Sequence, residues 1–181
     1  MDRCTVFVQA GDVAVSREPC DFTTVLGSCV SVCLYDLVNC WGGMNHFMHV
    51  GRNNTDPNDA RWSRPAIHLL LEKMLRLGAS PHDLKAKIFG GANVLSCIKA
   101  KIGENNYSAA YVELEAYGIP IIAGSVGGSL SRRVAFRSDT GEVQILSARG
   151  KRQIAVRLLA EAKETGNGNA QPWDRDGLHV A

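Results

Sequence analysis

Cys29 and His46 are residues whose types and spacing could support covalent catalysis. Cys29 directly follows Gly27 and Ser28, and glycine allows the tight bend that exposes a thiol and leaves backbone N–H groups free to bind an oxyanion. His46 comes 17 residues later, which fits a strand, a turn and a returning strand beside the first. A cysteine next to a histidine base is the arrangement of nucleophilic catalysis. The alternative is that both are core residues, as most free cysteines are, and we expect Cys33 to be such a packed thiol.

A zinc site is a second interpretation of the same segment. Soft metal ligands occur within 21 positions, namely Cys29, Cys33, Cys40, His46 and His49. Structural zinc sites generally use close pairs such as Cys-x2-Cys, and the spacings here contain none. We therefore expect neither a metal nor another cofactor.

The composition is that of an ordinary globular chain. Of the 181 residues, 45% are hydrophobic and 21% are charged, which suits one domain with its own core. The net charge of +2 gives no basic field for nucleic acid, and no apolar run approaches the roughly 20 residues that span a bilayer. The first residues lack the features of a signal peptide, so we expect a cytoplasmic protein whose six cysteines stay reduced.

Hydrophobic periodicity predicts the elements that must position the two residues. Val30, Val32 and Leu34 alternate on one face of a strand that starts directly after Cys29. A stripe of 3.6-residue period predicts a helix capped by Ser63 and ended by Gly78.

Other elements are expected from shorter patterns: strands over 5–10, 13–16, 44–49, 84–89 and 119–123, a helix over 106–117 and a hairpin over 134–146. Because helices interleave with strands after residue 60, we expect a layered α/β sandwich with mixed β-sheets. Residues 1–150 would form this single domain. Residues 151–164 would extend it as a helix or a strand, and 165–181 would be a disordered tail.

Several blocks between residues 5 and 148 resemble, in order, the CheD family of chemoreceptor glutamine deamidases. The blocks are Leu26-Gly-Ser-Cys-Val-Ser-Val-Cys-Leu-Tyr-Asp, Gly42-Gly-Met-Asn-His-Phe-Met, Ala86-Lys-Ile-Phe-Gly-Gly-Ala-Asn, Ile102-Gly-Glu-Asn-Asn, Gly118-Ile-Pro-Ile and Gly127-Gly-Ser-Leu-Ser-Arg-Arg-Val. The sequence departs from the family where His49-Val50 replaces a usual Leu-Pro and where Trp62-Ser63-Arg64 replaces a usual Tyr-Ala-Asp.

The resemblance implies a hydrolase of the cysteine type with a Cys-His-Thr triad. Cys29 falls on the nucleophile, His46 on the base and Thr23 on the threonine that orients the imidazole, with Thr24 adjacent. Residues expected to contact the substrate are Gly27, Ser28, Asn45, Gly90 and Gly91.

The implied reaction converts receptor glutamine side chains to glutamate through a thioester on the cysteine. Chemoreceptor cytoplasmic domains would be the partners, and hydrolysis of receptor glutamyl methyl esters is a related activity. Two alternatives stay open: a module that binds a CheC-type phosphatase, and a cysteine protease or transglutaminase-like acyl transferase. We expect a monomer.

Overall fold

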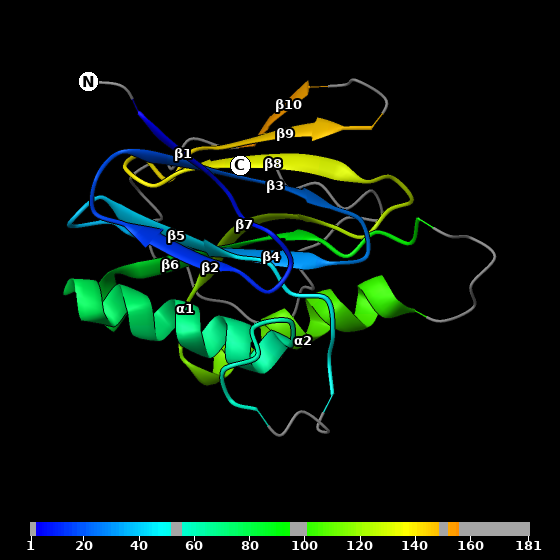
Figure 1. The fold of residues 1–181 in the computed structure, drawn as a ribbon, viewed down its shortest axis with the longest axis horizontal. Helices are drawn as coiled ribbons and strands as arrows, with labels where there is room; N and C mark the ends of the chain where they lie inside the picture. The colour runs from blue at the N-terminus through cyan, green and yellow to red at the C-terminus, as the bar shows by residue number, and fades with distance from the viewer. Residues whose placement is uncertain (1–2, 52–55, 95–100, 149–151, 156–181) are drawn as a thin grey trace, which may run out of the picture.

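The computed structural model describes residues 3–51, 56–94, 101–148 and 152–155, and they form three layers (Figure 1). Two five-stranded sheets face each other, and both helices cover the outer face of the second sheet. The expected layered α/β arrangement with mixed sheets is confirmed. Within the described part of the chain, no helix has the length and apolarity needed to cross a membrane.

The two sheets contain strands that are distant in sequence. The first sheet has the order β1 (Cys4–Phe7), β3 (Cys20–Leu26), β8 (Arg132–Arg137), β9 (Val143–Ser147) and β10 (Arg152–Ala155). The second has the order β2 (Val13–Ser16), β5 (Trp41–Asn45), β4 (Val30–Asp36), β6 (Leu84–Gly90) and β7 (Ile121–Val126). The pairs β1–β3 and β6–β7 are parallel, and the other pairs are antiparallel.

Strand β4 is buried on both faces and separates two hydrophobic cores. Val30, Val32 and Leu34 point toward the helices, as their alternation predicts. Cys33 and Tyr35 point the other way, into the core between the two sheets. Cys33 is fully buried there, so its prediction as a packed thiol is confirmed.

Helix α1 (Ser63–Leu77) packs against the second sheet through its predicted apolar stripe. Gly78 ends it in the left-handed conformation at φ 102°, as expected. The predicted cap is wrong by one residue: Trp62 occupies the N-cap position without a side-chain hydrogen bond, and Ser63 is the first helical residue. After a short 3₁₀ helix, η1 (Pro81–Asp83), and strand β6, helix α2 (Ile102–Ala116) begins four residues before the expected 106.

Other differences lie in the N-terminal half. The strands β1 and β2 belong to different sheets, because the turn at Gly11, with φ 93°, carries the chain from one sheet to the other. Strand β3 is an element that the sequence patterns did not predict.

At the C-terminal end, residues 152–155 form a strand, one of the two alternatives for that extension. The expected tail over 165–181 lies outside the described residues.

Candidate active site

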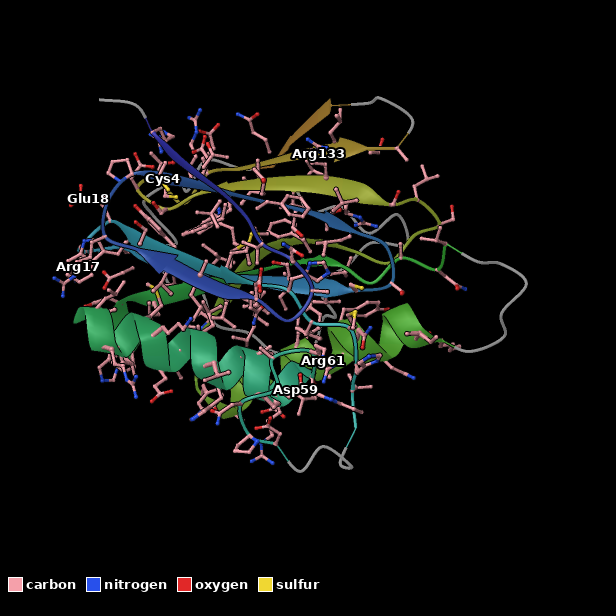
Figure 2. The ribbon with its side chains drawn as sticks, viewed as in Figure 1. Cys4, Arg17, Glu18, Asp59, Arg61 and Arg133 are labelled. Atoms are coloured by element: carbon pink, nitrogen blue, oxygen red, sulfur yellow. The ribbon has the colours of Figure 1, made fainter. Side chains whose placement is uncertain are left out.

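His46 directly follows β5, and its backbone is held by the turn between β1 and β2. Its N–H donates to the Asp12 carbonyl at 3.1 Å, and its carbonyl accepts from the Gly11 N–H at 2.7 Å. Two residues further on, the Met48 N–H donates to the carbonyl of Arg61, in the loop before α1 (Figure 2). The position of the imidazole therefore depends on three separate chain segments.

The imidazole is oriented across the interface between the two sheets. His46 Nδ1 lies 2.9 Å from Thr24 Oγ1 and 3.3 Å from the Val8 carbonyl oxygen. The Thr24 hydroxyl donates its own proton to the Val8 carbonyl at 2.7 Å. Because that proton is already used, the hydroxyl is an acceptor toward His46, and Nδ1 carries the imidazole proton. Nε2 is then the basic nitrogen, and it is buried without a hydrogen-bond partner among the described residues.

The threonine that contacts His46 is Thr24, whereas Thr23 was the residue expected there. In β3 the side chains of Cys20, Phe22, Thr24 and Leu26 are all buried, whereas Thr23 is half-buried on the alternate face. Successive side chains of a strand point to opposite faces, so Thr23 points away from His46. The expectation of Thr23 followed from the family spacing alone, and the alternation of β3 favours Thr24.

Cys29 and His46 lie on the same face of the second sheet. Val30 and Phe47 form an antiparallel bridge, with N–H···O distances of 3.0 and 2.9 Å, and both side chains point toward the helices. Their neighbours Cys29 and His46 therefore point to the opposite face, where Cys29 packs against the core between the sheets. They are diagonal neighbours across this bridge, a relation in which an aromatic ring such as the imidazole can reach toward the neighbouring position.

Burial shifts both groups toward their neutral forms. Loss of solvation raises the pKa of the Cys29 thiol, and the nearby backbone N–H of Cys29 only partly opposes this. Loss of solvation also lowers the pKa of the His46 imidazole, against the opposing effects of the Val8 carbonyl and Asp12. Both shifts favour a neutral thiol at Cys29 and a neutral imidazole at His46.

The substrate-facing candidates divide into two groups. Gly27 and Ser28 are half-buried, like Cys29, and remain at the surface beside it. Gly90 and Gly91 are buried behind this turn, where the Gly91 N–H donates to the Cys29 carbonyl at 2.8 Å. We revise their role from substrate contact to support of the Cys29 backbone.

Asn45 is also buried, and it supports the strand that leads to His46. Its Oδ1 accepts the Val32 N–H at 2.8 Å, and its carbonyl accepts the Ser31 hydroxyl at 2.5 Å. The side chain thus takes the place of a ladder hydrogen bond between β4 and the chain after β5. Its full burial removes it from the surface that a substrate would reach.

Asn106 is a site residue to which the sequence patterns gave no role. From α2 its Nδ2 donates to the carbonyls of Ser28 and Met48, both at 2.9 Å. It therefore connects the turn that carries Cys29 to the segment that follows His46. Its presence in the block that begins at Ile102 was the available signal, since a buried polar side chain needs a partner.

The zinc interpretation is not supported by the geometry. Cys40 lies in the turn after β4, at the end of the strand opposite to Cys29, and Cys33 is enclosed in the core. His49 is exposed and packs on the Trp62 ring, with 5.2 Å between ring centroids. Among the residues that the structure describes, no three His, Cys, Asp or Glu side chains come together as metal ligands.

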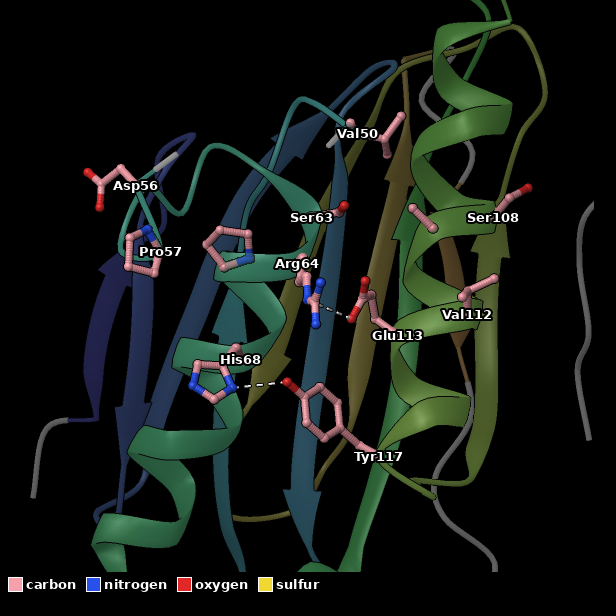
Figure 3. Close-up of a pocket in the computed structure, with 13 residues that line it drawn as sticks. Val50, Asp56, Pro57, Ser63, Arg64, His68, Ser108, Val112, Glu113 and Tyr117 are labelled. Atoms are coloured by element: carbon pink, nitrogen blue, oxygen red, sulfur yellow. Dashed lines mark hydrogen bonds and ion pairs between the residues drawn. The ribbon is translucent and has the colours of Figure 1, made fainter. Parts of the chain in front are cut away.

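A groove of about 1150 Å³ lies elsewhere, between α1 and α2 on the outer face (Figure 3). His68 and Tyr117 form a hydrogen bond of 2.9 Å across it, and Arg64 lies 4.0 Å from Glu113. Cys29 and His46 are not part of its lining. Cys29 instead lies at a half-buried turn outside this groove.

Known proteins of one family are similar to this chain over most of its length. Residues 48–147 match the family model described as CheD chemotactic sensory transduction. A probable chemoreceptor glutamine deamidase CheD from Trichlorobacter lovleyi is 42% identical over 149 residues, 81% of this chain and 91% of that protein. Proteins named probable chemoreceptor glutamine deamidase CheD 1 are similar as well. The one from Anaeromyxobacter dehalogenans is 40% identical, and the match covers 77% of this chain and 82% of that protein. The one from Ruegeria sp. is 41% identical, and the match covers 89% of this chain and 86% of that protein.

The chain belongs to the CheD family. The resemblance seen in the sequence blocks is thereby confirmed. The CheD relatives are named glutamine deamidases, which are hydrolases of side-chain amides.

Proposed function

We propose that this CheD family member hydrolyses glutamine side-chain amides of chemoreceptors, with Cys29 as nucleophile, His46 as base and acid, and Thr24 as the orienting residue. One observation carries the assignment of roles. The Thr24 hydroxyl fixes the proton on His46 Nδ1 and leaves Nε2 free, on the same sheet face as the half-exposed Cys29 thiol.

The first half of the reaction forms a thioester. Cys29 Sγ attacks the amide carbon of the glutamine side chain while its proton passes to His46 Nε2, and the carbonyl oxygen becomes an oxyanion. Backbone N–H groups of the turn at Cys29 are the donors available to this oxyanion. His46 returns the proton to the amide nitrogen, the C–N bond breaks, and ammonia leaves.

In the second half of the reaction, water hydrolyses the thioester. His46 Nε2 accepts a proton from the water that attacks the thioester carbon. The C–S bond breaks, the proton returns to Cys29 Sγ, and glutamate is released. The sum is glutamine plus water giving glutamate plus ammonia, so the cycle needs no reactant besides the receptor and water.

A neutral hydroxyl is sufficient as the orienting group. A carboxylate would stabilise the imidazolium more strongly, but a thiol gives up its proton more readily than a serine hydroxyl does and needs a weaker base. Thr24 supplies the correct tautomer without adding a charge between the sheets.

We further propose that the protein acts as a monomer in the cytoplasm, on the cytoplasmic domains of chemoreceptors. A glutamyl methyl ester could enter the same acyl transfer, with methanol leaving in place of ammonia.

The test is mass spectrometry of a recombinant receptor cytoplasmic fragment incubated with the protein. Each deamidation replaces NH2 by OH and raises a peptide mass by about one dalton. Cys29→Ala should abolish the shift, whereas Cys4→Ala, which removes an exposed thiol on β1 (Figure 2), should not change it. No shift with a cognate receptor would refute the proposed deamidation and favour the alternative of a module that binds a CheC-type phosphatase, to be tested by a pull-down.

A further inference from the structure

Three successive carbonyls of the turn that carries Cys29 are anchored by hydrogen bonds. The Gly27 carbonyl accepts from the Ala92 N–H at 2.7 Å, and the Cys29 carbonyl accepts from the Gly91 N–H at 2.8 Å. Between them, the Ser28 carbonyl accepts from Asn106 Nδ2 at 2.9 Å. The first two anchors are backbone groups, and Asn106 is the side chain among the three.

Anchoring a carbonyl also sets the direction of the next N–H. The C=O and N–H of a trans peptide are fixed in one plane and point in opposite directions. With the Ser28 carbonyl held toward α2, the Cys29 N–H points away from α2, toward the side on which its thiol and His46 lie. Among the described residues, no carbonyl accepts a hydrogen bond from this N–H.

The amide of Asn106 is suited to this task because it serves two acceptors at once. Its Nδ2 has two protons, and both partners are carbonyl oxygens, at Ser28 and Met48. The residue is 1% exposed, so substrate does not reach it directly. Tight packing places it there: one turn earlier in α2, a Cβ on Gly103 would lie 2.3 Å from the Gly91 carbonyl oxygen.

We propose that Asn106 is a positioning residue that directs the Cys29 N–H toward the oxyanion of the reaction by holding the Ser28 carbonyl. This inference rests on the proposed deamidase function. Asn106 acts on the transition state through the backbone, because an oxyanion forms during attack and is absent from the bound glutamine.

The test separates this role from a merely structural one. Asn106→Ala is compared with Asn105→Ala, its exposed neighbour on the same helix, in deamidation of the receptor fragment and in alkylation of Cys29 by iodoacetamide across pH. Alkylation is a displacement at carbon that forms no oxyanion, so it reports the thiol and His46 alone. We expect Asn106→Ala to lower kcat about tenfold or more with KM within about twofold, and to leave the rate and pH profile of alkylation unchanged. Asn105→Ala should resemble the wild type.

Two results would overturn the proposal: an unchanged kcat in Asn106→Ala, or a loss of kcat matched by an equal loss of alkylation and of thermal stability. If Asn106→Ala does not fold, Asn106→Leu provides the same comparison, since a side chain of similar shape fills the space and has no N–H donor for either carbonyl.

A readout without substrate keeps this inference distinct from the proposed function. In protein labelled with 15N-cysteine, with Cys29→Ala identifying the Cys29 amide signal, Asn106→Ala should shift or broaden that signal and leave the Cys33 amide in place. An unchanged Cys29 amide signal would refute the positioning role of Asn106, whether or not the wild type acts on receptors. Inactivity of the wild type on receptors would refute only the proposed deamidase function.

Discussion

Replacing Thr24 by valine tests which hydroxyl orients the catalytic histidine. Valine keeps the shape of the buried side chain and removes the acceptor that lies 2.9 Å from His46 Nδ1. Only the Val8 carbonyl would remain near Nδ1, at 3.3 Å. The imidazole would then be free to rotate or to exchange its tautomer, which removes Nε2 from its place as the base.

The expected loss follows from the hydrogen bond that the reaction strengthens. When His46 takes the thiol proton, the bond from Nδ1 becomes a bond from a charged group, which contributes about 1.5–3 kcal/mol. Since about 1.4 kcal/mol corresponds to a tenfold change in rate, kcat should fall about 10- to 100-fold. The Val8 carbonyl also loses its donor at 2.7 Å, which should reduce the free energy of unfolding by about 1–3 kcal/mol.

Thr23→Val is the matched control, because Thr23 is half-buried on the opposite face of the same strand. Initial rates of glutamine deamidation, measured by peptide mass well below each variant's melting temperature, decide between the two residues. Thr24→Ser, which restores the hydroxyl, should recover most of the activity. Full activity in Thr24→Val together with a loss in Thr23→Val would refute the assignment drawn from the parity of β3.

The remaining predictions concern pH and the turn behind Cys29. Because burial lowers the pKa of His46, the neutral base should persist on acidification, and kcat/KM should fall only below about pH 6.5, the ordinary value of a histidine; an acid limb above that pH in rate profiles would contradict this. Because burial raises the pKa of the Cys29 thiol, its alkylation rate should still increase beyond about pH 8.5, and a plateau below that pH would count against a neutral resting pair. Gly90→Ala would place a Cβ 2.2 Å from the Cys29 carbonyl oxygen at φ 107°, so its free energy of unfolding in urea should fall by more than about 2 kcal/mol. Gly118→Ala, where no atom lies within 4 Å, is the control and should lose about 1 kcal/mol. Equal losses in the two variants would show that the contact with Cys29 is relaxed at little cost.

The sequence predicted the elements whose patterns are local. One hydrophobic core contains both the alternating residues Val30, Val32 and Leu34 and the apolar stripe of α1. The buried face of each element could therefore be predicted from its own sequence pattern. The facing of Cys29 and His46 onto one side of the second sheet followed from the spacing of a strand and its return.

The difference between Thr23, expected beside His46, and Thr24, found there, has one physical cause: strand β3 was not predicted from the sequence. The apolar residues Phe22 and Leu26 lie two positions before and two positions after Thr24. Strand periodicity alone would therefore have placed Thr24 on the same buried face. Gly90, Gly91 and Asn106 are different, because their roles arise from contacts with a turn more than 60 residues away in sequence. No local pattern reports such contacts.

The proposed site is distributed over all three layers, and this would account for a neutral orienting group. Cys29 and His46 belong to the second sheet, Thr24 belongs to the first, and Asn106 reaches the site from the helical layer. The core between the sheets is largely apolar, so a carboxylate at position 24 would need its own hydrogen-bond donors there and would raise the pKa of the imidazole. The imidazolium form of His46 would then be favoured at rest over the neutral base. A hydroxyl whose proton is already given to the Val8 carbonyl holds the same tautomer and leaves the imidazole neutral. In the proposed mechanism, burial and a neutral partner together therefore keep the base unprotonated until the thiol attacks and becomes charged.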